Sequence, residues 1–113
     1  MDKFLELREA VSDFIREREW EKFHNPKDIA ISISIEAAEL LENFQWRDKK
    51  EVENMLDDEE YVNSIIEEMA DVMIYLIALS NKLNVDLIDA SFKKIKKNEK
   101  KYPKEKFKGN AFL

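Results

Sequence analysis

The chain has 113 residues, of which 44% are hydrophobic and 39% charged, with a formal net charge of −6. This length is typical of one domain with a core and a charged surface. One Gly and two Pro leave few turn residues for an all-β fold, and zero Cys excludes disulfides, zinc-thiolate sites, iron–sulfur clusters and cysteine nucleophiles. The composition therefore predicts an all-α protein.

The first predicted helix covers residues 2 to about 19, where apolar residues recur at helical spacing among charged ones. A break follows at Asn25-Pro26, because Pro disfavours helix at the residue before it. A second helix is predicted from residues 26–28 to about Trp46. Its segment 29–35 alternates with period two, which alone is typical of a strand. A lone strand has no sheet to join, however, and residues 36–44 continue with strong helix formers, so we expect a helix.

Residues 47–53 are polar and charged and predict a loop or a short helix. The next long helix is predicted over about 58–82, with Asp57 and Asp58 as candidate caps at its N-terminus. Residues 69–79 are apolar on nearly every side. A helix without a polar face in so small a protein predicts burial by a second subunit, and hence a homo-oligomer.

The last predicted helix runs from Val85 to about Tyr102 and is stopped by Pro103. Its residues expected to point inward are Leu87, Ile88, Ala90, Phe92 and Ile95. We expect residues 103–113 to form a loose tail. The whole chain, 1–113, is then expected to be one domain, a bundle of four main helices that assembles as a homo-oligomer.

Charge is distributed unevenly along the chain. The segment Lys93 to Lys108 contains nine Lys and two acidic residues, whereas the remainder is acidic. This asymmetry indicates an anion bound near the basic segment, or an acidic metal site opposite it. The first residues have no secretory pattern, and the longest apolar run, 72–79, is short of the roughly 20 residues of a membrane span. We expect a cytoplasmic protein with no membrane partner.

Acidic residues interrupt the apolar faces of the second helix and of the helix over 58–82. Glu36 and Glu39 are spaced i, i+3, as are Glu68 and Asp71, so each pair projects from one face of its helix. Neither pair has a Lys or Arg three or four residues away. If the two helices pack side by side, the four carboxylates converge and repel one another unless a cation binds them. All-oxygen ligands suit Mg²⁺ or Mn²⁺.

These acids also have other interpretations. Each acid could belong to the solvated stripe of an amphipathic helix, but two matched pairs in apolar surroundings favour metal binding. A di-iron centre needs Glu-x-x-His on two helices, and the chain has this spacing once, at Glu21-x-x-His24. Gly109 is the only Gly, so no glycine-rich loop binds phosphate. Phosphates are therefore expected to be bound by metal and Lys.

The motif Glu36-x-x-Glu39 followed by Glu68-x-x-Asp71 resembles the metal motif of the MazG-like superfamily of all-α nucleoside triphosphate pyrophosphohydrolases. The chain is most similar to the dCTP pyrophosphatase branch, and the matching segments are 18–26, 36–46, 67–76, 85–87 and 98–103. The resemblance implies Mg²⁺-dependent cleavage of an NTP or dNTP, such as the pyrimidine nucleotide dCTP, to the monophosphate and pyrophosphate. It implies dimers or tetramers, and metal ligands at the two acidic pairs.

The resemblance also implies roles for other residues. The residues expected at the base and sugar are Trp20, His24, Gln45 and Trp46, and those expected at the phosphates are Lys94, Asn98 and Tyr102. Lys94, Asn98 and Lys101 share one helix face at i, i+4, i+7. Glu67 or Glu42 is predicted to orient or deprotonate the attacking water, and Lys94 and Lys101 to offset charge on the leaving pyrophosphate. The alternatives are core or interface packing for the two Trp residues, packing for Tyr102 and solvent exposure for the Lys run. For His24 the alternative is a hydrogen bond in a loop or at a helix N-terminus.

Two other functions are compatible with parts of the sequence. A non-catalytic helical interaction or scaffold protein would use the acids for solubility alone. Nucleic-acid binding through Lys93 to Lys108 is disfavoured by the acidic remainder and by the lack of a groove-reading motif. The preferred base and sugar, the number of metal ions, the phosphorus attacked and the choice between dimer and tetramer stay open.

Overall fold

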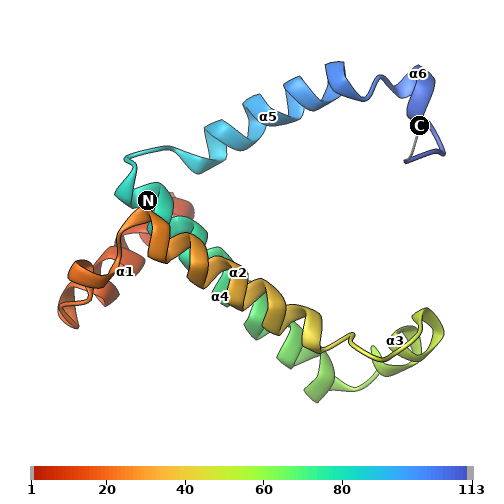
Figure 1. Cartoon of the computed structure of the whole chain (residues 1–113), viewed down its shortest axis with the longest axis horizontal. Coiled ribbons are helices and arrows are strands. Elements are labelled where there is room, and N and C mark those ends of the chain that lie inside the picture. The colour runs from red at the N-terminus through yellow and green to blue at the C-terminus, as the bar shows by residue number, and fades with distance from the viewer. Residues whose placement is uncertain (1, 112–113) are drawn as a thin grey trace. The chain divides into compact units, whose positions relative to one another are not determined.

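The computed structural model describes residues 2–111, which form helices and no strand (Figure 1). In chain order the elements are α1 (Lys3–Glu17), the 3-10 helix η1 (Glu21–Phe23), α2 (Pro26–Glu42), α3 (Lys49–Met55), α4 (Glu59–Lys82), α5 (Leu87–Lys101) and α6 (Lys104–Phe107). The all-α prediction is confirmed, and so is the helical interpretation of residues 29–35.

Acidic or amide side chains begin all four long helices. Asp2, Asn25, Asp58 and Asp86 each accept a hydrogen bond from a backbone N–H of the first turn. Such caps satisfy donors that have no partner within the helix. Pro26 occupies the first position of α2, where its missing N–H costs nothing. Of the two predicted caps for α4, the structure uses Asp58.

Three predictions about the helices need correction. The second helix ends at Glu42, four residues before Trp46, because Asn43 to Trp46 form turns and Trp46 has a positive φ of 67°. Residues 103–113 contain the short helix α6. Ile88, Phe92 and Ile95 were expected to point inward, but they are exposed. Helical periodicity identified their shared face but not a surface to cover it. Residues 1, 112 and 113 of the predicted domain lie outside the described residues.

The chain divides into two compact units, Met1–Leu83 and Asn84–Leu113. In the first unit, α2 and α4 pack against each other and run in opposite directions, and α1 packs against α4 (Figure 1). The second unit contains α5 and α6, where Tyr102 and Phe107 meet edge to face with ring centroids 5.2 Å apart. The acidic pairs on α2 and α4 therefore belong to one unit.

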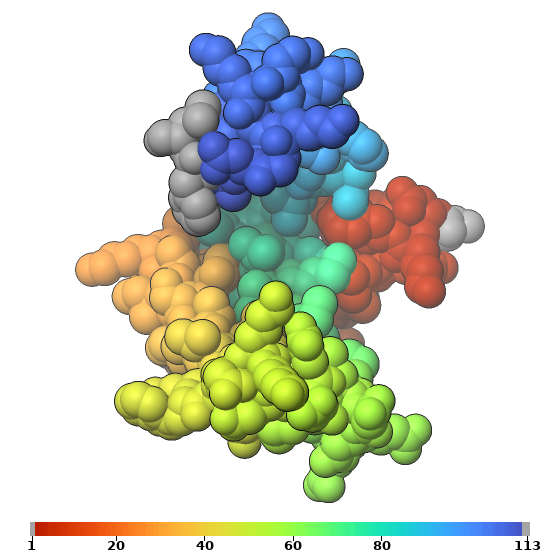
Figure 2. Space-filling view, turned by 90° about the vertical axis from the view of Figure 1, so that its right-hand side faces the viewer, coloured from red at the N-terminus to blue at the C-terminus, as the bar shows by residue number. Residues whose placement is uncertain are grey.

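The core of the first unit is small. Its buried apolar residues are Val11, Ile29, Tyr61, Ile77 and Ala78. Val11, Ile77 and Ala78 form one cluster, against which Phe4, Leu7 and Ile15 of α1 pack. Elsewhere in this unit, α3 and the first turns of α4 lie together at the surface (yellow to green, Figure 2). Within residues 2–111, no helix is long and apolar enough to cross a membrane.

Candidate active site

Three carboxylates from two helices meet at the α2–α4 contact. One carboxylate oxygen from each of Glu36, Glu39 and Glu68 lies within 4.8 Å of the other two, and we call this group the carboxylate cluster. Glu36 Oε2 and Glu68 Oε2 are buried and have no hydrogen-bond partner within residues 2–111. The ion pairs of that part of the chain are Arg16–Asp13 and Lys93–Asp89, so no basic side chain neutralises the cluster.

The cluster shifts the titration of two of its members. The pKa of the Glu36 carboxyl is raised to about 7, chiefly by burial and also by a hydrogen bond with Glu39 and by repulsion from Glu39, Asp71 and Glu68. Burial also raises the pKa of Glu68, with additional repulsion from Glu39, Asp71 and Glu42. Partial desolvation and like charge both disfavour the ionised form. A divalent cation among these oxygens would favour the ionised carboxylates and so lower the pKa of both Glu36 and Glu68.

The donor set fits a divalent metal. The three cluster acids offer oxygen ligands alone, which is the preference of Mg²⁺ and Mn²⁺. The buried, unpaired oxygens of Glu36 and Glu68 are satisfied once they coordinate a cation. Asp71, the fourth predicted ligand, lies beside the three, since its charge acts on both Glu36 and Glu68. The burial of these oxygens and their lack of a basic partner thus support the metal site that the sequence predicts at the two acidic pairs.

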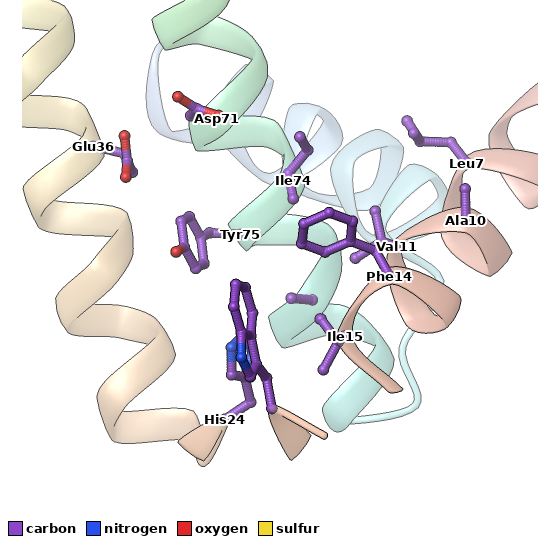
Figure 3. A pocket seen from close by; sticks show the side chains of 12 residues that line it. Leu7, Ala10, Val11, Phe14, Ile15, His24, Glu36, Asp71, Ile74 and Tyr75 are labelled. Carbon is purple, nitrogen blue, oxygen red and sulfur yellow. The ribbon is translucent and has the colours of Figure 1, made fainter. Parts of the chain in front are cut away.

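An apolar pocket of about 420 Å³ opens on one side of the cluster. Glu36 and Asp71 face each other at one end, His24 lies at the other, and Tyr75 lies between them (Figure 3). The remaining lining residues are apolar or aromatic: Leu7, Ala10, Val11, Phe14, Ile15, Trp20, Ile74 and Ala78. A flat organic group can enter this space with its charged substituent toward the carboxylates.

The turn after α1 contributes Trp20 to the lining of the apolar pocket. Glu19 N–H donates to Arg16 O and Trp20 N–H to Ile15 O, and Glu19 takes a positive φ of 55°. This hydrogen-bond pattern reverses the chain at a helix C-terminus. It directs the Trp20 ring against Phe14, with centroids 5.8 Å apart in an edge-to-face arrangement. The turn therefore positions an aromatic wall of the pocket.

His24 also contributes to the lining of the apolar pocket. Its ring stacks on Tyr75, with centroids 6.3 Å apart and an interplanar angle of 24°. His24 Nδ1 is buried and has no hydrogen-bond partner within residues 2–111. Because buried polar atoms normally have a partner, Nδ1 is available to hydrogen-bond a ligand. The structure therefore brings Trp20 and His24 of the predicted substrate residues to one pocket with Glu36 and Asp71.

A second, polar pocket of about 370 Å³ opens on the other side of the cluster. Its lining residues are Glu39, Glu42, Asn43, Arg47, Met55, Asp58, Glu60, Tyr61, Ser64 and Glu68. A hydrogen-bond network orders its floor, because Tyr61 Oη donates to Asn43 O over 2.6 Å and Ser64 Oγ donates to Asn43 Oδ1 over 2.9 Å. Of the two predicted general bases, Glu42 lines this pocket, whereas Glu67 is exposed and lines neither pocket.

The other predicted substrate residues are Gln45 and Trp46 in the first unit and four residues in the second. Gln45 and Trp46 follow the end of α2 and line neither pocket, and Trp46 is 92% exposed. Lys94, Asn98, Lys101 and Tyr102 belong to the second unit, where Lys94 and Lys101 are exposed and Asn98 is half-buried. Lys101 Nζ lies 5.3 Å from the Tyr102 ring centroid. Their contact with phosphates stays a prediction.

Sequence reasoning did not identify several lining residues. Tyr75 follows Asp71 by four residues and Glu68 by seven, so the acidic face of α4 continues into it. In the same way, Asn43 follows Glu39 by four residues and Ser64 precedes Glu68 by four. Helical spacing from the acids was therefore a usable signal for these three. No comparable signal identified the α1 wall, because its apolar residues have ordinary core spacing.

Comparison with known proteins relates this arrangement to a family. The MazG-like family model matches residues 31–111, which include the carboxylate cluster and Asp71. The chain belongs to the MazG-like family. Related sequences include dCTP pyrophosphatase 1 from Mus musculus, 34% identical over 106 residues, and from Homo sapiens, 35% identical over 98 residues. These matches cover 94% and 87% of this MazG-like chain, but 62% and 58% of the relatives' own length.

A solved structure provides the corresponding spatial comparison. The crystal structure of a pyrophosphatase from Archaeoglobus fulgidus DSM 4304 is 42% identical to this MazG-like chain, with a TM-score of 0.83. The match covers 91% of this chain and 94% of that one. The all-helical fold is thus shared over nearly the full length of both.

Proposed function

We propose that this MazG-like protein is a Mg²⁺-dependent nucleoside triphosphate pyrophosphohydrolase. The observation that supports this most directly is the carboxylate cluster, with unpaired buried oxygens on Glu36 and Glu68, at the boundary of the apolar and polar pockets. A nucleoside triphosphate has an organic end and a strongly charged end, and a site with this division suits both. The names of the mouse and archaeal relatives, a dCTP pyrophosphatase and a pyrophosphatase, support the same reaction.

In this proposal the two helices supply the ligands of the metal. Glu36, Glu39, Glu68 and Asp71 would hold Mg²⁺, which would supply activation of a water molecule and neutralisation of phosphate charge. Glu42 lines the polar pocket beside Glu39 and Glu68, and it is the acid better placed to orient the attacking water or accept its proton. Water adds to one phosphorus, a phosphoanhydride bond breaks, and the products are the nucleoside monophosphate and pyrophosphate.

The apolar pocket is proposed to bind the nucleoside. Trp20 and Tyr75 offer aromatic surfaces to a base, and His24 Nδ1 offers one hydrogen-bonding atom. A pyrimidine nucleotide such as dCTP is the proposed substrate, by similarity to the mouse and human relatives. Lys94, Asn98, Lys101 and Tyr102 are proposed to bind phosphates, and Gln45 and Trp46 to contact the base or sugar.

A panel of all NTPs and dNTPs with Mg²⁺, with pyrophosphate release as the readout, tests this proposal. We expect turnover that is lost on metal chelation and restored by Mg²⁺. Glu39→Gln and Asp71→Asn are expected to abolish turnover of the best substrate. If no nucleotide is hydrolysed and Mg²⁺ leaves the melting temperature unchanged, the non-catalytic scaffold function replaces this one. If activity survives both substitutions, the assigned site is wrong.

We also propose that the protein is a homo-oligomer through the apolar stripe of α4. Ile66, Met69, Met73 and Leu76 recur three or four residues apart and remain between 39% and 56% exposed. A continuous apolar stripe of this kind on a soluble chain favours a protein partner, and a second copy presents the same stripe. Sedimentation velocity is expected to show a dimer or tetramer for the native chain and smaller species for Met73→Lys. A monomeric native chain would refute the assembly.

A further inference from the structure

We propose that Asn81 is a positioning residue that fixes the position of α1, the helix that forms one wall of the apolar pocket. This inference rests on the proposed function, in which that pocket receives the nucleoside. Asn81 lies near the C-terminal end of α4, outside both pockets beside the cluster. Its role is indirect, because it acts through α1.

The side-chain amide of Asn81 is fully engaged with α1. Asn81 Oδ1 accepts a hydrogen bond from Arg8 Nε over 3.0 Å. Asn81 Nδ2 donates to Arg8 O and to Ser12 Oγ, both over 3.1 Å. Arg8 and Ser12 are one helical turn apart, so the amide holds two successive turns of α1 at once. All three side chains are half-buried, which makes these bonds stronger than they would be in water.

The remaining attachment of α1 to α4 is a small apolar cluster. Val11 packs on Ile77 and Ala78, with Phe4, Leu7 and Ile15 around them. Val11, Leu7 and Ile15 also line the apolar pocket, so a shift of α1 against α4 changes the width of that pocket (Figure 3). We call the three hydrogen bonds of Asn81 to α1 the amide clamp. Apolar packing is non-directional and allows helices to slide, whereas hydrogen bonds require a defined geometry, so the amide clamp restricts this shift.

The carboxylates do not depend on α1 in this way. Glu36, Glu39, Glu68 and Asp71 are held by the packing of α2 on α4, and α1 supplies none of them. Loss of the clamp is therefore expected to weaken recognition of the nucleoside and to leave recognition of metal and phosphate intact. A general loss of folding would weaken both, and the two effects can be separated with two ligands.

The test compares two ligands, each in the presence of Mg²⁺, by isothermal titration calorimetry of the 113-residue chain. One is dCMP, which carries the nucleoside, and the other is inorganic tripolyphosphate, which does not. For Asn81→Ala we expect the Kd of dCMP to rise roughly tenfold, the size of effect for losing several modest hydrogen bonds. We expect the Kd of tripolyphosphate to stay within about twofold of the native value.

Two further variants make the result decisive. Ser12→Ala removes one of the three bonds, and we expect the dCMP Kd to rise about two- to fourfold. Asn63→Ala is the matched control, since Asn63 lies on the same helix, is exposed and lines no described pocket. Its two Kd values should equal the native ones. If Asn81→Ala does not fold, an unchanged dCMP Kd in Ser12→Ala overturns the proposal.

Other outcomes are equally clear. The proposal is overturned if Asn81→Ala binds dCMP with native affinity, or if it loses affinity for dCMP and tripolyphosphate in parallel. It is also overturned if the native protein does not bind dCMP. The proposed function is judged separately by nucleotide turnover of the native protein. If the native protein hydrolyses nucleotides but Asn81→Ala has unchanged affinities, the role of Asn81 is refuted and the proposed function is not.

Discussion

The apolar pocket and the polar pocket both border the carboxylate cluster, but the residues that line the rest of each pocket differ in polarity. On the side of Glu36 and Asp71 the walls are mainly aromatic and aliphatic, whereas on the side of Glu39 and Glu68 they are mainly acidic, amide and hydroxyl groups, with Arg47 as the one basic residue. The same two helices contribute to both. The polarity of the site therefore changes along the length of α2 and α4, within a few helical turns. One pair of helices can therefore offer separate surfaces to the organic part of a ligand and to its charged part.

The largest expected effect on activity comes from a substitution in the carboxylate cluster, which borders both pockets. Glu68→Gln removes one charge from the cluster, and we expect kcat to fall roughly 10²–10³-fold, comparable to the loss of a strong electrostatic contact in a reacting centre. Mg²⁺ should then no longer raise the melting temperature. Steady-state pyrophosphate release and differential scanning fluorimetry measure these effects. Glu53→Gln on α3 is the control for charge, because Glu53 is exposed and lines neither pocket. Full turnover by Glu68→Gln would refute the metal site.

The next effect concerns the apolar side alone. Tyr75→Ala removes a ring that stacks on His24 and lines the apolar pocket, so KM for the nucleotide should rise about tenfold with kcat nearly unchanged. Tyr75→Phe keeps the ring and should behave almost as the native protein. The measurement is a full saturation curve for each variant. If kcat falls as far as for Glu68→Gln, the two sides do not have separate roles.

A smaller effect concerns pH in the absence of metal. The folded-state pKa of Glu36 is about 7, above its ordinary value of 4.5, because of burial and neighbouring carboxylates. The folded state therefore binds this proton more tightly than the unfolded state, and stability should fall as the pH rises from 4.5 through 7. After allowance for solvent at this partly exposed site, the loss is about 1–2 kcal/mol.

Chemical denaturation across that pH range, with and without Mg²⁺, measures this loss. Glu36→Gln should flatten the metal-free profile, and saturating Mg²⁺ should reduce the loss in the native chain because a cation favours the ionised carboxylate. Asp13→Asn is the control, since Asp13 is paired with Arg16 away from the cluster. A native profile that rises with pH over this interval would contradict the pKa assignment.

The smallest effect concerns the turn that carries the aromatic wall. Glu19 has a φ of 55°, which glycine adopts without steric cost. Glu19→Gly should therefore raise the free energy of unfolding by up to about 1 kcal/mol. Glu19→Ala keeps a Cβ at the same φ and should give no gain. Urea denaturation measures both. A loss of stability in Glu19→Gly would indicate that the Glu19 side chain stabilises the turn.

Most of the fold follows from local rules along the chain. The boundaries of α1, α4 and α5 lie close to the predicted ones, because aspartates and a proline start or stop these helices through contacts only a few residues long. The end of α2 was predicted four residues late. There the turn is stabilised by Tyr61 Oη donating to Asn43 O, a contact between residues 18 apart in sequence. Helix propensity does not contain that information.

For the candidate site, the acids that share a helix face can be identified from the sequence, since i, i+3 spacing places two side chains on the same side of any α-helix. Three features come from the tertiary structure: Glu36, Glu39 and Glu68 meet, Tyr75 and α1 line one apolar pocket, and Asn81 hydrogen-bonds to α1. Each of these depends on the register and spacing of packed helices. Those quantities are set by the sum of many weak contacts between distant residues, and no local pattern in the chain specifies them.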